Sequence, residues 1–216
     1  MSREDRRAGR KTLLLHAAFE LFGSGGEAAL SVRAVCRESG LHHRYFYENF
    51  ADTDELMGAL YDMVYADLRR LLTAATADLP DDRARLRSGM RAVLDFSAAD
   101  PRHGQILFAT APTNPVLVRL RAAAQQELRE YIFAVRQRDD PTSDRVAAEV
   151  AAAIYAGATT QLNEQWLSGS LGNDLDLVIE HAVHLMTPDP VGKKKSTKPS
   201  RARPRTRAGG VPRTGR

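Results

Sequence analysis

The chain has 216 residues with a formal net charge of +4; 43% of them are apolar and 6% aromatic, a mixture that supplies a packed core and favours helices over strands. The single cysteine, Cys36, excludes an intrachain disulfide and a cysteine-based metal site, and it indicates a reducing compartment. No apolar run is long enough to cross a membrane and the N-terminal stretch lacks the apolar segment of a secretion signal, so we expect a cytoplasmic protein.

The charge is unevenly divided along the chain. Residues 191–216 carry ten Lys or Arg and no acidic residue, and residues 1–50 carry eight basic and six acidic groups. Residues 51–190 carry 13 basic and 21 acidic groups. We therefore expect an anionic polymer to meet this chain at its two ends.

The first fifty residues predict three helices. Residues 7–22 carry an apolar stripe at helical spacing, and the Gly-rich turn after them lacks the Lys and Ser or Thr of a phosphate-binding loop. The basic residues before this helix could lie on phosphates or fray in solvent. Ser31 is a good N-cap for a second helix, and Gly40 allows the sharp turn that separates it from a third, which runs towards Phe50.

The third helix leaves a row of His, Arg and Tyr facing outward between residues 42 and 47. Such a row is unusual on a solvated helix and natural on a surface that reads nucleic acid. Arg can fork onto guanine edges, and Tyr and His can hydrogen-bond bases or phosphates. A merely solvated helix is the alternative. His42 and His43 are adjacent and point in different directions, which makes them a poor metal pair.

Apolar residues recur with helical period through the rest of the fold, and Pro, Asp or Gly mark each junction. Six further helices are predicted. Three cover about residues 52–79, 102–111 and 144–167. One lies between the breaks at 80–82 and 100–101, one runs from the turn at 112–115 to about residue 138, and the last carries an apolar stripe from Leu175 to Met186. No run predicts a strand. We therefore expect an all-α chain of about nine helices.

The predicted elements divide into three parts. A helix-turn-helix head covers residues 1–50, and a helical body covers residues 51–190. Residues 191–216 form a basic tail with too few apolar residues to bury a core, so we expect it to be disordered.

Several polar or aromatic residues lie on otherwise apolar helices of the body and could line a ligand pocket. They are Phe96, His103, Phe108, Tyr131, Tyr155, Thr159 and Asn163. Tyr155, Thr159 and Asn163 recur at i, i+4 and i+8 and could supply polar anchors in a mostly apolar pocket. They could equally belong to the core or to a subunit interface. We find no nucleophile–base pair, metal-ligand cluster or cofactor fingerprint, so we predict no enzyme, no metal site and no cofactor.

Residues 40–62, GLHHRYFYENFADTDELMGALYD, resemble the signature of the TetR (tetracycline-repressor) family of bacterial regulators. The residues that fall on the family's helix-turn-helix pattern and on the acidic-Leu motif after it are Val32, Arg33, Val35, Gly40, Leu41, Tyr47, Phe50, Glu55 and Leu56. The close resemblance covers about residues 13–60. Beyond them it lies in the number and order of helices.

The resemblance implies that the third helix enters the major groove and that two copies, joined through the last two helices, bind successive grooves. It implies base-edge contacts from His43, Arg44 and Tyr45. Phosphate contacts are implied for Ser31, Arg33, His42 and Tyr47.

Two departures from the family pattern bear on DNA binding, and a third, Cys36 in place of a small Ala, does not. Asp54 stands where a phosphate-binding Lys is common and Glu48 is also acidic, so both should repel a phosphate. His42 stands where Ser or another capping residue is common, which leaves the cap of the third helix open. The basic ends of the chain could restore the lost attraction.

These observations predict a sequence-specific transcription regulator. We expect a homodimeric repressor that binds a palindromic DNA operator and is released by a small apolar effector. The alternative is a ligand-independent or architectural DNA-binding protein that depends on its basic tail.

Overall fold

The structure is a computed structural model that describes residues 2–109, 114–139 and 144–187. The described part contains helices and no strand, which confirms the all-α prediction. The elements are α1 (Arg3–Gly25), the 3-10 helix η1 (Gly26–Ala29), α2 (Val32–Ser39), α3 (His43–Tyr47), α4 (Thr53–Thr76), α5 (Asp82–Ala99), α6 (Pro101–Phe108), α7 (Pro115–Asp139), α8 (Arg145–Leu167) and α9 (Leu175–Met186). No described helix has the length and hydropathy needed to span a bilayer. The predicted tail lies outside the described residues.

The first helix begins at Arg3, four residues before its predicted start. Ser2 Oγ accepts a hydrogen bond from the Asp5 backbone at 2.9 Å, and the Asp5 carboxylate accepts one from the Ser2 backbone at 2.7 Å. This reciprocal cap satisfies two donors of the first turn, where no apolar residue marks the helix. The basic residues near the N-terminus are therefore part of α1 and do not form a loose arm.

The head is a helix-turn-helix packed on α1. Leu14 and Phe22 of α1, Val35 of α2 and Phe46 of α3 are all buried in one cluster. Gly40 has a φ of 68°, in the left-handed region, so a side chain at this position would strain the turn between α2 and α3.

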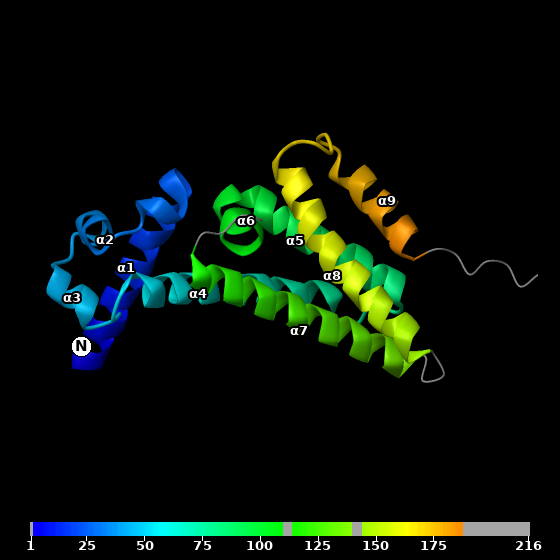
Figure 1. The fold of residues 1–216 in the computed structure, drawn as a ribbon, viewed down its shortest axis with the longest axis horizontal. Helices are drawn as coiled ribbons and strands as arrows, with labels where there is room; N and C mark the ends of the chain where they lie inside the picture. Colours follow the sequence, from blue (N-terminus) through cyan, green and yellow to red (C-terminus); the bar gives the residue numbers. More distant parts are fainter. Residues whose placement is uncertain (1, 110–113, 140–143, 188–216) are drawn as a thin grey trace, which may run out of the picture.

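The hydrophobic core continues from the head into the body. Phe50, at the end of the head, shares one buried cluster with Leu60 of α4, Ile106 of α6 and Leu117 of α7. In Figure 1, α1, α2 and α3 lie at one end of the molecule, and α4 leads from them into the body alongside α7. The chain turns at the predicted boundary at residue 50, and one hydrophobic core extends across it from the head into the body.

The last two helices pack on α5 through a second cluster. Met90 and Leu94 of α5 are buried with Ile179 and Val183 of α9, and Trp166 of α8 packs against them. Ion pairs from Arg87 to Glu180 and from Arg91 to Asp176 also join α5 to α9. Figure 1 shows α8 and α9 on the side of the body away from the head.

Candidate nucleic-acid interface and body cavity

The short helix α3 separates a buried face from an exposed one. Phe46 is fully buried, whereas His43 and Arg44 are exposed and Tyr47 is 59% exposed. Tyr45 is half-buried. His43, Arg44 and Tyr47 are thus accessible to a duplex that approaches this end of the molecule.

His42 is the N-cap of α3, which answers the question left open by its departure from the family pattern. Its Nδ1 accepts a hydrogen bond from the Arg44 backbone at 3.3 Å. Because Nδ1 accepts, a neutral His42 carries its proton on Nε2 and can donate it to a phosphate oxygen. The rings of His42 and His43 lie 3.9 Å apart between centroids, so each limits the movement of the other.

Glu48 is compensated by two arginines. Its carboxylate pairs with Arg10 of α1 at 3.0 Å and with Arg44 of α3 at 3.2 Å. The Arg10 guanidinium also lies over the Tyr45 ring, 4.5 Å from its centroid. This network ties α1 to α3 and offsets the negative charge that the sequence places beside the candidate DNA-contacting residues.

The two candidate residues outside α3 and its cap lie at the start of α2. Ser31 caps α2 by accepting a hydrogen bond from the Ala34 backbone at 3.2 Å. Arg33 is exposed and, with His42 and His43, lines a shallow hollow between α2 and α3. All seven candidate DNA-contacting residues thus lie in α2, in α3 or at the N-caps of these two helices.

A second site is a cavity of about 1110 Å³ between α4, α5, α7 and α8, with the end of α6 at one extremity. Four candidate pocket residues line it: Phe108, Tyr131, Tyr155 and Thr159. Leu68, Leu72, Met90, Leu128 and Ile132 form much of its wall. Apolar walls with a few polar groups are typical of small-molecule sites.

The other three candidate pocket residues lie outside this cavity lining. Phe96 and His103 stack on each other with ring centroids 4.2 Å apart, and His103 Nδ1 is 3.2 Å from the Phe96 carbonyl. His103 also lies 5.4 Å from the ring of Phe19 in α1. Asn163 is fully buried beside Gly104 of α6. These three residues are part of the packing between α1, α5, α6 and α8.

Two arginines that sequence reasoning missed line the cavity. Arg121 donates hydrogen bonds to the carbonyls of Gln105, Ile106 and Ala109, at 2.6 to 3.0 Å, and so binds α7 to the C-terminal end of α6. Burial lowers the pKa of the Arg121 guanidinium. Arg136 donates to the Tyr155 hydroxyl at 3.1 Å. The available signal was that both arginines border the apolar stripe of α7.

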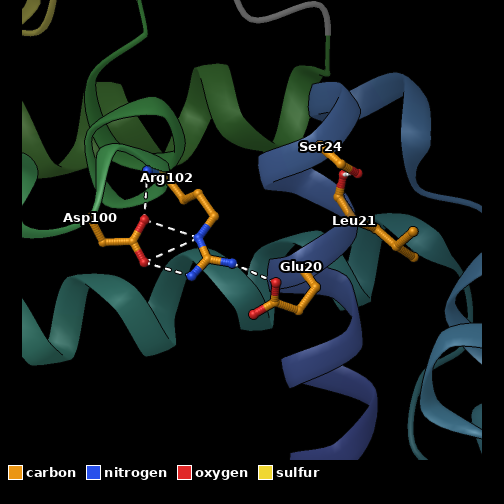
Figure 2. Close-up of polar contacts among 5 residues, drawn as sticks. All are labelled: Glu20, Leu21, Ser24, Asp100 and Arg102. Carbon is orange, nitrogen blue, oxygen red and sulfur yellow. Dashed lines mark hydrogen bonds and ion pairs between the residues drawn. The ribbon is translucent and has the colours of Figure 1, made fainter.

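The other end of α6 is joined to α1. Figure 2 shows Arg102 between two carboxylates: it pairs with Glu20 of α1 at 2.6 Å and forks onto Asp100. The hydrogen bond from Arg102 holds the pKa of the Asp100 carboxyl below its usual range. A side chain at Gly23 would overlap the Arg102 side chain, so the two helices approach closely here. The helix α6 is therefore linked to the head at its start and to the cavity wall at its end.

Comparison with known proteins agrees with this geometry. Residues 14–60 match the family model for bacterial regulatory proteins of the tetR family. A TetR-like transcriptional regulator from Rhodococcus sp. RHA1 has 18% identity and a TM-score of 0.64, over 82% of this chain and 93% of that one. A second transcriptional regulator from Rhodococcus sp. Rha1 has 21% identity and a TM-score of 0.66, over 82% and 92%.

The fatty acid degradation regulator FadR from Bacillus halodurans has 12% identity and a TM-score of 0.66, over 82% of this chain and 94% of that one. At these sequence identities the three structures support the fold alone, and the match over residues 14–60 supports the family of that segment. Residues 14–60 thus form an N-terminal domain of the tetR family of bacterial regulatory proteins, and the described chain has the all-α fold of TetR-like regulators.

Proposed function

We propose that this protein is a repressor that binds a palindromic operator as a homodimer and is released by a small, largely apolar ligand. The observation that carries the proposal is the position of α4. Leu56 in its first turns is buried in one cluster with Phe46 of α3, and its later turns, from Tyr61 to Thr76, line the cavity. One helix thus contacts both the DNA-reading end and the ligand cavity.

The operator contacts in this proposal follow from the exposed residues of α2 and α3. His43, Arg44 and Tyr45 contact base edges in the major groove, because they stand on the helix that enters it. Ser31, Arg33, His42 and Tyr47 contact phosphates and fix the register of the head. Residues 1–50 then form the DNA-binding part, residues 51–190 the ligand-binding and dimerising part, and residues 191–216 a basic extension.

The proposed dimer contact is an apolar strip on α8 and α9. Val146, Val150 and Ile154 follow each other at i, i+4 and i+8 and are 63%, 53% and 57% exposed. Leu177 and Leu185 of α9 are exposed as well. A run of exposed aliphatic side chains on one helix supports a protein contact there, because a solvated helix rarely carries one.

Release follows from the spacing of the two heads. An operator accepts a dimer whose recognition helices lie roughly 34 Å apart, about one turn of duplex. A ligand between α4 and α7 that moves α4 changes this distance and weakens binding. The ligand weakens operator binding only if it binds the released conformation of the dimer more tightly than the DNA-bound conformation.

Selection of bound DNA from a random pool tests the proposal. We expect a palindromic consensus with half-sites about ten base pairs apart, a dimer in solution by light scattering, and loss of operator affinity when the correct ligand is titrated. A monomeric protein, or a selected pool without symmetry, would contradict it. If none of the ligands that the protein binds changes its affinity for the operator, the ligand-independent alternative holds.

A further inference from the structure

We propose that the cavity takes an elongated apolar molecule with one anionic head group, and that Arg136 binds this head. The inference rests on the proposed function only in treating the cavity as a ligand site. It adds the chemical class of the ligand and its orientation: head at the far end of α7, apolar chain towards α6.

The cavity is long. Its lining residues on α7 run from Val118 to Arg136, eighteen residues apart, which corresponds to about 27 Å along the helix axis. The middle of this length is lined by Leu72, Met90, Leu128 and Ile132. A long apolar chain buries more of such a wall than a compact ligand does, and each buried methylene contributes about 0.8 kcal/mol before the costs of binding.

The cavity is also positively charged. Four arginines and two carboxylates line it, although residues 51–190 as a whole are acidic. Arg69 pairs with Glu127 at 3.5 Å. Arg85 pairs with Asp82 at 2.8 Å. Neither Arg121 nor Arg136 forms an ion pair among the described residues, and the one carboxylate that acts on Arg121 is that of Glu27, outside the cavity lining.

These two arginines differ in what they can still bind. Arg121 gives four hydrogen bonds to the backbone carbonyls at the end of α6, so an anion there would have to displace them. Arg136 gives one, to the Tyr155 hydroxyl, and its guanidinium lies 5.3 Å from the centroid of the Tyr155 ring. Tyr155 is itself fixed, because its hydroxyl donates to the Met186 carbonyl at 2.6 Å. Arg136 is thus a held guanidinium with N–H groups left for the two oxygens of a carboxylate.

This orientation lets the ligand act on the helix-turn-helix end of the protein. When its anionic group lies at Arg136, a hydrocarbon chain that fills the cavity ends near Leu107 and Phe108 of α6 and Tyr61 of α4. Of these elements, α6 is the one that Arg121 links to α7 and Arg102 links to α1. A short chain would stop before it reached them.

Palmitate and hexadecanol test the proposal, because they share a chain and differ in the charge of the head. Binding to the full-length protein can be followed by calorimetry and by the fluorescence of Trp166, the single tryptophan, which packs against the cluster containing Met90 of the cavity wall. The variants are Arg136→Gln and, as a matched control on the same helix, Arg129→Gln, since Arg129 contacts Gln126 and does not line the cavity.

We expect the wild type and Arg129→Gln to bind palmitate more tightly than hexadecanol. Arg136→Gln should weaken palmitate binding roughly ten- to a hundredfold, the value of one charge-assisted interaction, and leave hexadecanol binding unchanged. Equal affinity for palmitate and hexadecanol in the wild type, or equal losses in the two variants, would overturn the proposal.

Operator binding is measured separately in the same samples. Palmitate that binds through Arg136 without weakening the operator complex would support this inference and contradict the proposed release mechanism. An operator complex released by a neutral ligand, with palmitate not bound, would support release and contradict this inference.

Discussion

Arg44 is the exposed arginine of α3, and it lies beside the carboxylate of Glu48. Its Nε pairs with Glu48, which leaves the terminal nitrogens of the guanidinium for a base edge. If Arg44 forks onto a guanine, Arg44→Ala should cost about 1–3 kcal/mol on the selected operator and relax the preference at one base pair. Binding to a panel of operators mutated one base pair at a time measures this. A uniform loss across the panel would make Arg44 a phosphate contact.

Glu48 should restrain affinity while improving discrimination. It holds Arg10 and Arg44 in place, but its charge faces the polyanion. We expect Glu48→Gln to bind all DNA more tightly, because one repulsive charge is gone, and to lose selectivity for the operator, because Arg44 is no longer oriented. The ratio of operator to scrambled-sequence affinity measures both effects. Glu38→Gln on the exposed side of α2 is the control, and an equal change in that ratio would show that position 48 has no special role.

At the scale of single elements, α6 is the helix whose two ends are held by different neighbours. Arg102 joins its start to Glu20 of α1, and Arg121 joins its end to α7 beside the cavity. A ligand that shifts α6 would therefore have to move α1 and α7 with it, or break one of these two links. The ion pair is partly solvent-exposed, so its contribution to stability is small, about 0.2–1 kcal/mol.

Removing the link between α1 and α6 should therefore affect coupling more than folding. We expect Glu20→Gln to shift the unfolding midpoint little and to leave ligand affinity unchanged, while reducing the factor by which ligand weakens operator binding. Titrations with and without the operator give that factor. Glu180→Gln breaks a comparable arginine pair between α5 and α9, away from the head, and serves as the control. An unchanged coupling factor in Glu20→Gln would exclude this ion pair from the transmission.

The elements themselves could be predicted from the sequence because their signals are local. Caps, apolar periodicity and Gly40 mark the helices and the turn of the head, and the DNA-facing row lies within six consecutive residues. The start of α1 was missed because its first turn carries no apolar residue. The cavity was predicted only in part. Residues spaced by four drift about 40° around a helix at each step, so Asn163 points roughly 80° away from Tyr155 and enters the core.

Contacts between distant parts of the chain had no such signal. Glu20 and Arg102 are 82 residues apart, and nothing near either residue marks the other as its partner. Arg121 borders the apolar stripe of α7, but nothing in the sequence indicates which carbonyl groups it binds. Its role depends on the end of α6 lying against α7, which only the packed fold determines.

At the scale of the whole molecule, DNA binding should depend on the apolar strip of α8. Ile154→Asp places a charge in the middle of that strip, which a buried dimer contact would not tolerate. We expect a folded monomer by light scattering, with operator affinity reduced to that of a single head. Leu71→Asp, on α4 and 48% exposed, is the matched control and should remain dimeric. Dimeric Ile154→Asp protein would locate the subunit contact elsewhere.

The ten basic residues of 191–216 make a separate prediction about overall charge. Each phosphate that they neutralise adds roughly 0.9 to the slope of log affinity against log salt. Deletion of these residues should therefore weaken binding to every sequence and flatten the salt dependence, while the operator keeps its advantage over scrambled DNA. That advantage depends on His43, Arg44 and Tyr45 of α3, which we propose contact base edges. If the truncated protein bound all DNA alike, sequence preference would reside in the tail, and the assignment of α3 as the reading helix would be wrong.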